Sequence, residues 1–267
     1  MHNNINTLFE YLWQNYLRVT PTATKIHKLL GSTQNNDIIN DHIALRTFNL
    51  EKVSLEKLAK HFTSLGYEEC EEYNFEDKKI HAKHYEHPNS NYPKVFISEL
   101  LVEKFSPVIQ EVIHFLVSQV DEDMILNDNF LYSGRHWNID YRIYKILLEE
   151  SEYAAWLAAW GYRANHFTVS INHLEKFNTV EEVNQKLKEA GFILNSSGGE
   201  IKGSKELLLE QSSTLADKYP VKFNDWEKEL PSCFYEFALR YCDKKGEIYT
   251  GFVESSANKI FESTDTR

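Results

Sequence analysis

An internal repeat restricts the fold of this chain more than any other feature. The two copies begin with DHIALRTF at 41–48 and NHFTVSIN at 165–172, and they continue with SLEKLAKHFTSLGY at 54–67 and TVEEVNQKLKEAGF at 179–192. Gly66 lies 24 residues after His42, and Gly191 lies 25 residues after His166. Two segments that keep a strand, a helix and their spacing this closely indicate two copies of one structural unit.

The helix of each copy carries its own start and stop signals. Ser54 is a predicted N-cap in the first copy, and Thr179 with Glu182 has the spacing of a capping box in the second. Gly66 and Gly191 are predicted to end the two helices, and an aromatic residue follows each of them.

Each copy continues with β-rich segments and ends in a strand that contains a glutamate. Glu99 in KVFISEL lies 57 residues after His42, and Glu236 in CFYEFALRY lies 70 residues after His166. The sequence therefore predicts an α+β fold of two βαβββ units whose sheets curl into a cup. The predicted boundaries are a single globular domain over 1–267, with a first unit at 41–103, a helical insertion at 104–162 and a second unit at 163–254. An amphipathic N-terminal helix is predicted over 5–18.

Composition excludes several classes of partner. The chain has 29 basic and 40 acidic residues and a formal charge of -11, which disfavours nucleic acid because no basic surplus is available for phosphates. The longest apolar run, AAWLAAW, is far shorter than the roughly 20 residues of a membrane span, so no membrane partner is expected. Three cysteines without metal-site spacing and an N-terminus without a signal-peptide pattern predict a cytoplasmic location.

The first strand carries two polar side chains on one face. Side chains alternate along a strand, so His42, Ala44 and Arg46 share one face while Ile43 and Leu45 share the other. At about 3.3 Å per residue, His42 and Arg46 are roughly 13 Å apart along the backbone, which leaves room for a small molecule between them.

The repeat brings equivalent strands together at the centre of the predicted cup, so that His42 and His166 face each other. Adding Glu236 gives two imidazoles and one carboxylate, the set that binds non-haem Fe(II) and leaves positions open. Glu99 is in the corresponding strand of the first unit, and a set of two histidines and two glutamates would instead suit a Zn(II) or Ni(II) isomerase or hydrolase. A third possibility is a non-catalytic protein that binds a small molecule.

Several segments together resemble the DUF1338 family, which includes 2-oxoadipate dioxygenase/decarboxylases and has the vicinal oxygen chelate fold. These segments are DHIALRTF, SEYAAWLAAWGYRANHFTVSIN, LLLEQSST, CFYEFALRY and GFVESSANKIFEST. The resemblance covers nearly the whole chain. It implies an Fe(II) ion bound by His42, His166 and Glu236, and an arginine, here Arg46, that binds the distal carboxylate of the substrate.

The activity implied by the resemblance is the conversion of 2-oxoadipate and dioxygen to 2-hydroxyglutarate and carbon dioxide. The expected partners are thus a 2-oxo acid and dioxygen, and the oligomeric state is left open. Further polar groups in the matching segments are candidate substrate contacts: Gln211, Ser212, Ser255, Ser256 and Asn258. The chain lacks additional segments of the longer family members, so the identity of the substrate is less constrained than the metal chemistry.

Overall fold

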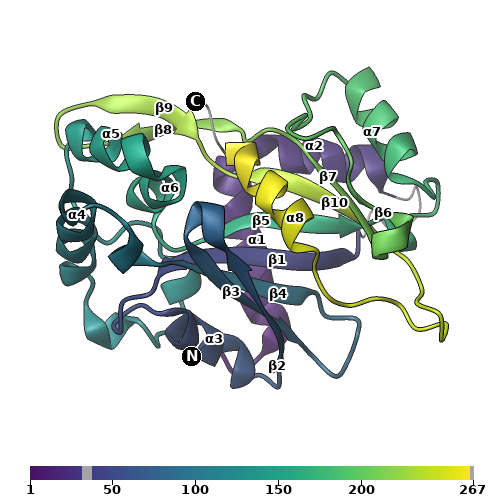
Figure 1. The fold of residues 1–267 in the computed structure, drawn as a ribbon, viewed down its shortest axis with the longest axis horizontal. Helices are drawn as coiled ribbons and strands as arrows, with labels where there is room; N and C mark the ends of the chain where they lie inside the picture. Colours follow the sequence, from purple (N-terminus) through teal and green to yellow (C-terminus); the bar gives the residue numbers. More distant parts are fainter. Residues whose placement is uncertain (32–37, 265–267) are drawn as a thin grey trace.

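The centre of the fold is a mixed eight-stranded sheet. We describe it from a computed structural model, which covers residues 1–31 and 38–264. The strands follow the order β2-β3-β4-β1-β5-β10-β7-β6 across the sheet (Figure 1). Their bounds are β1 Asn40–Phe48, β2 Glu68–Phe75, β3 Ile80–Glu86, β4 Lys94–Leu100, β5 Ala164–Ser170, β6 Lys202–Ser204, β7 Leu209–Ser213 and β10 Phe234–Arg240. A separate hairpin of β8 Lys218–Lys222 and β9 Glu227–Pro231 lies between β7 and β10 in the chain.

The helices complete the arrangement. Their bounds are α1 Ile5–Val19, α2 Pro21–Leu30, α3 Leu55–Thr63, α4 Pro107–Ser118, α5 Tyr141–Glu150, α6 Glu152–Trp160, α7 Val180–Glu189 and α8 Glu254–Ile260. The predicted N-terminal helix is present as α1, and Pro21 begins a second helix directly after it. Helices α4, α5 and α6 lie in the segment between the two units. Among the described residues, no helix is both long enough and apolar enough to cross a membrane.

Two copies of one βαβββ unit build the sheet. The first consists of β1, α3, β2, β3 and β4, and the second of β5, α7, β6, β7 and β10. In each copy the first strand is parallel to the last, since β1 pairs with β4 and β5 pairs with β10. The units join where β1 and β5 pair in antiparallel orientation. The predicted α+β fold with two such units is confirmed.

The repeated turns also agree with the sequence. Gly66 and Gly191 have backbone φ angles of 96° and 84°, which L side chains rarely adopt. Thr179 and Glu182 form the predicted capping box, with both of its hydrogen bonds present. Ser54 precedes the first residue of α3, but its side chain makes no capping hydrogen bond.

The two faces of the sheet have different coverings. Helices α1, α3 and α7 pack on one face, where Phe167 contacts Trp13 and Tyr16 of α1. Helix α8 lies over the other face and contacts β2 near one edge of the sheet as well as β6 and β7 at the other (Figure 1). Because one short helix reaches strands at both ends of the sheet, the sheet must curl around it.

Candidate active site

A small cavity lies on the concave face of the sheet, beneath α8. Both units and the chain after residue 250 contribute to its walls. The lining residues are His42, Ala44, Arg46, Phe96, Ser98, Asn165, His166, Gln211, Glu236, Phe252, Ala257, Ile260 and Phe261. The three residues predicted to share a face of the first strand, His42, Ala44 and Arg46, therefore all line it.

Two histidines and one glutamate meet in this cavity, close to the junction of the two units. Ala44 pairs with His166 across β1 and β5, and Glu236 pairs with Thr168 across β5 and β10. His166 Nε2 lies 3.1 Å from Glu236 Oε2, and His42 Nε2 lies 3.6 Å from Glu236 Oε1. The three buried residues offer ligand atoms that all lie within 4.8 Å of one another. The fold thus brings together the three residues that the sequence singled out as metal ligands.

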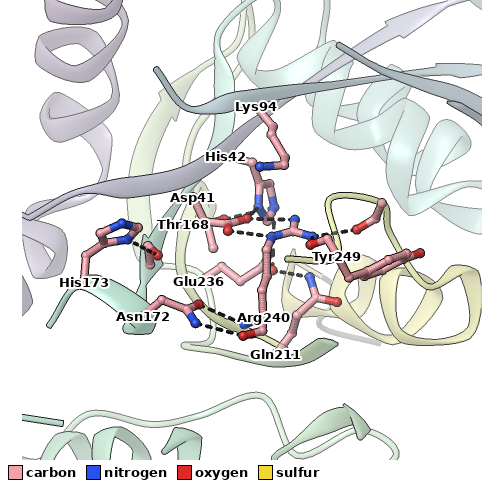
Figure 2. A network of polar contacts seen from close by, with 12 residues as sticks. Asp41, His42, Lys94, Thr168, Asn172, His173, Gln211, Glu236, Arg240 and Tyr249 are labelled. Carbon is pink, nitrogen blue, oxygen red and sulfur yellow. Dashed lines mark hydrogen bonds and ion pairs between the residues drawn. The ribbon is translucent and has the colours of Figure 1, made fainter. Parts of the chain in front are cut away.

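The residue before each histidine fixes the orientation of its ring. Asp41 faces the ring of His42 (Figure 2), and His42 Nδ1 lies 2.7 Å from Asp41 Oδ2. His166 Nδ1 lies 3.0 Å from Asn165 Oδ1. Carboxylate and amide oxygens only accept hydrogen bonds, so both Nδ1 atoms carry a proton. Both Nε2 atoms then face Glu236. Metal-binding histidines in proteins almost always show this arrangement.

Burial and charge act against each other in this cluster. Burial alone would raise the pKa of Glu236, but His42 and His166 lower it to about 2. Burial would lower the pKa of His42, but Glu236 and Asp41 more than offset this effect and raise it. His166 has no carboxylate behind it, and burial lowers its pKa despite the contact with Glu236. Glu236 is therefore ionised at neutral pH, as a metal ligand must be.

The carboxylate of Glu236 is only partly satisfied by the protein. Gln211 Nε2 donates a hydrogen bond to Glu236 Oε1 at 2.5 Å, whereas Oε2 receives none from the described residues. Glu236 is fully buried, and a buried charged oxygen without a donor is costly unless a cation or a proton satisfies it. Two imidazole nitrogens and this oxygen fit a divalent transition metal.

Glu99 does not belong to this cluster, and its predicted equivalence to Glu236 is wrong. Across β1 and β4, the residue that matches Glu236 by register is Phe96, which pairs with Ala44 and lines the cavity. Glu99 is three residues further along β4, so its side chain points to the other face. There Oε2 accepts a hydrogen bond from Leu55 N at 2.9 Å, at the first residue of α3, and Oε1 lies 3.2 Å from His81 Nδ1. Glu99 provides the capping contact that Ser54 does not.

Arg46 lies in the cavity wall with a side chain that is 1% exposed. Its guanidinium carbon lies 4.9 Å from the ring centre of Tyr153 and 5.1 Å from that of Trp156. Nη1 is 3.4 Å from Glu152 Oε1, Nη2 is 3.2 Å from Thr264 Oγ1, and Nε has no hydrogen-bond partner among the described residues. A buried guanidinium that has one long ion pair and a free N–H donor can bind another carboxylate.

The other predicted polar contacts occupy different positions. Gln211 lines the cavity, but Ser212 points to the opposite face, where its hydroxyl donates to Asn184 Oδ1 of α7 at 2.7 Å. In α8 the cavity wall is formed by Ala257 and Ile260, with Phe261 just after the helix. The three polar residues predicted from that segment are not among the lining residues: Ser255, Ser256 and Asn258. Ser255 is exposed, whereas Ser256 is buried against the segment around Gly203. The prediction that these four residues, including Ser212, contact substrate does not agree with their positions.

Sequence reasoning missed two residues that orient the histidines, Asp41 and Asn165. Their signal is that each histidine of the repeat follows a side chain with an acceptor oxygen, in DH and NH. It also missed the aromatic residues Phe96, Phe252 and Phe261, for which no sequence pattern gives a position in a cavity wall.

Comparisons with known proteins agree with this geometry. The profile of the HGLS family, described as 2-oxoadipate dioxygenase/decarboxylase, matches residues 4–131 and 118–243. A rice protein named 2-oxoadipate dioxygenase/decarboxylase, chloroplastic/amyloplastic, is 36% identical over 93% of this chain and 75% of its own length.

Two crystal structures resemble the fold closely. Hydroxyglutarate synthase from Oryza sativa, solved in complex with 2-oxoadipate, has a TM-score of 0.91 and 32% identity, over 97% of this chain and 91% of that one. A protein of Shewanella frigidimarina that carries the provisional label of hydrolase has a TM-score of 0.92 and 63% identity, over 95% of this chain and 99% of that one. The family profile covers most of the chain, and the rice protein is matched over three quarters of its length. The chain is therefore a member of the 2-oxoadipate dioxygenase/decarboxylase family.

Proposed function

We propose that this protein is an Fe(II)-dependent dioxygenase and decarboxylase that converts 2-oxoadipate and dioxygen to 2-hydroxyglutarate and carbon dioxide. His42, His166 and Glu236 would bind the metal, and Arg46 would bind the carboxylate at the far end of the substrate. Support comes from the family membership and from the rice relative that was solved with 2-oxoadipate.

One observation carries the proposal: a single cavity is lined both by a metal-binding cluster and by a guanidinium whose Nε has no hydrogen-bond partner among the described residues. His42 and Arg46 lie four residues apart on the same face of β1, and both line the cavity. A 2-oxo diacid has a keto acid that can chelate a metal and a second carboxylate that can pair with an arginine. The distance along β1 therefore selects the chain length of the acid.

The protein contributes binding, orientation and exclusion of water. Arg46 would bind the distal carboxylate through its free Nε and one Nη atom, in the bidentate way that the guanidinium plane allows. Gln211 holds the carboxylate of Glu236 in place through Oε1. Phe96, Phe252 and Phe261 line the cavity with apolar surface and keep bulk water from the reacting carbons.

The ion would supply the chemistry that side chains lack, namely the chelation of the 2-oxo acid and the activation of dioxygen. Atoms and electrons balance without another reductant. The six-carbon diacid loses one carbon as carbon dioxide, and both atoms of dioxygen remain in the five-carbon product. Oxidation at the keto carbon and hydroxylation of its neighbour provide the four electrons that dioxygen takes up.

The alternative of a Zn(II) or Ni(II) isomerase or hydrolase was predicted with Glu99 as a fourth ligand. Glu99 cannot bind a metal in this cavity, because it lies on the opposite face of the sheet. Zn(II) or Ni(II) could still occupy the three-residue cluster, so the identity of the metal is part of the proposal. We further propose a cytoplasmic location, which the cysteine content and the N-terminal sequence favour, and a 2-oxo acid and dioxygen as the partners.

The proposal is tested by loading the protein with Fe(II) under anaerobic conditions and then adding air and substrate. We expect one dioxygen consumed and one carbon dioxide released per 2-oxoadipate, with 2-hydroxyglutarate as the product. The matched control is 2-oxohexanoate, which has the same carbon chain without the distal carboxylate and should react much more slowly. Turnover of 2-oxoadipate without dioxygen, or in the Zn(II) form, would favour the isomerase or hydrolase. Failure to retain any added metal would favour a non-catalytic binding protein.

A further inference from the structure

The two histidines of the cluster are supported unequally. Asn165, next to His166, is a neutral amide. Asp41, next to His42, is a carboxylate, and its side chain is 5% exposed. Figure 2 shows that Asp41 also faces Arg240, which is 199 residues away in the sequence. Of the two, only His42 has a carboxylate at its Nδ1 atom, because the residue before the histidine is an aspartate in the first unit and an asparagine in the second.

Arg240 uses nearly all of its donors on fixed partners. Nε donates to Asp41 Oδ1 at 2.7 Å, and Nη2 donates to Asp41 Oδ2 at 2.9 Å. Nη1 donates to the carbonyl oxygens of Tyr249 and Gly251, at 3.1 and 2.7 Å. Arg240 is 4% exposed and does not line the cavity. With four of its five N–H groups occupied, it is bound to the protein and unavailable to a substrate.

The segment held by Arg240 reaches the cavity through Phe252. The Phe252 ring meets the His42 ring edge-on, with centroids 4.8 Å apart and planes at 89°. The guanidinium of Arg240 lies 5.1 Å from the centre of the same ring, and Phe252 N donates to Tyr73 Oη at 3.1 Å. Arg240 thus contacts both supports of the His42 ring, the carboxylate behind it and the aromatic ring beside it.

We infer that Asp41 and Arg240 are positioning residues for the metal centre. Asp41 fixes His42 with Nε2 toward the metal position and increases its strength as a ligand. Arg240 holds Asp41 in that geometry and fixes the segment 249–252, so that Phe252 confines the ring from the side. This inference rests on the proposed metal function of His42. Neither residue touches substrate.

The test measures metal binding rather than turnover. Co(II) is the probe, because it can replace Fe(II) in such sites and its visible absorption reports ligand geometry. Three variants are compared with the wild-type protein. Asp41→Asn keeps the shape of the side chain and removes its charge, and Arg240→Lys keeps the charge and loses the paired contacts. Asp217→Asn is the matched control, since Asp217 accepts hydrogen bonds from Thr22 and does not line the cavity.

We expect Asp41→Asn to weaken Co(II) binding by about 10- to 100-fold and to alter the Co(II) spectrum, as losses of groups that orient metal-binding histidines typically do. Arg240→Lys should also weaken binding, and it should increase amide hydrogen exchange in a peptide covering residues 249–253. Asp41→Asn should leave that exchange near the wild-type rate, because the contacts of Arg240 with the two carbonyl groups remain. The control should match the wild-type protein in Co(II) affinity.

Two results would overturn this inference alone. The first is an Asp41→Asn protein that binds Co(II) within threefold of wild type and has an unchanged spectrum. The second is an Arg240→Lys protein in which amide hydrogen exchange at residues 249–253 is unchanged. This exchange can be measured even if the Asp41→Asn protein does not fold. A wild-type protein that binds no Co(II) would overturn both this inference and the proposed metal function, whereas the first two results leave the metal function intact.

Discussion

Replacement of Arg46 by methionine would test how the protein selects its substrate. The methionine side chain can occupy the space between Tyr153 and Trp156 without a charge, so the aromatic packing around the position is kept. Removing one partner of a buried, hydrogen-bonded charge pair costs roughly 2 to 5 kcal/mol. At 1.36 kcal/mol per factor of ten, kcat/KM for 2-oxoadipate should fall by about 30- to 5,000-fold.

Part of this loss would come from Glu152 and not from the missing contact. Glu152 Oε1 lies 3.4 Å from Arg46 Nη1, and without the guanidinium its carboxylate would repel that of the substrate. The double variant Arg46→Met with Glu152→Gln should therefore recover part of the activity. The four proteins of this double-mutant cycle separate the repulsion from the lost ion pair.

The assay is dioxygen uptake by Fe(II)-loaded protein with 2-oxoadipate and with 2-oxohexanoate. We expect Arg46→Met to lose activity toward the diacid, to change less than tenfold toward the monoacid, and to bind metal as the wild type does. An equal loss with both substrates would refute the reasoning, because it would show that Arg46 supports the site as a whole rather than the distal carboxylate.

Three further predictions concern the metal, the fold and pH. His166→Ala should leave a folded protein, checked by circular dichroism, that retains little metal after Fe(II) loading, and full metal retention would contradict its role as a ligand. Gly161→Ala should lower the free energy of unfolding in urea by about 1 to 3 kcal/mol or more, because φ is 63° and an added Cβ would lie 2.2 Å from a carbonyl oxygen of the facing loop. Gly191→Ala, where an added Cβ meets nothing within 4 Å, is its control and should cost less. Burial of Lys202 lowers its pKa from 10.5 to about 8, so the unfolded chain binds this proton more tightly than the folded protein does. The stability of the wild type relative to Lys202→Met should therefore rise between about pH 8 and 9.5. A stability difference in urea unfolding that stays constant across this range would contradict the prediction.

The repeat shows how much of the fold local sequence can predict. Strand alternation, the capping box at Thr179 and the glycines after the two helices are local patterns, and each is present in the structure. The same alternation placed His42 and Arg46 on one face, and both line the cavity. These features depend on backbone geometry within a few residues, which is why the sequence alone determines them.

The pairing of distant strands decided the composition of the site. A slip of one residue between strands turns every side chain to the other face, and only packing across the whole sheet sets that register. It put Phe96 where Glu99 had been expected, and it decided which of the neighbours Gln211 and Ser212 faces the cavity and which faces α7. Arg240 meets Asp41 across 199 residues of sequence for the same reason. The sequence by itself therefore determined the two units and their pair of histidines, whereas the tertiary structure decided which neighbours surround them, because those contacts depend on strand register and helix docking over the whole chain.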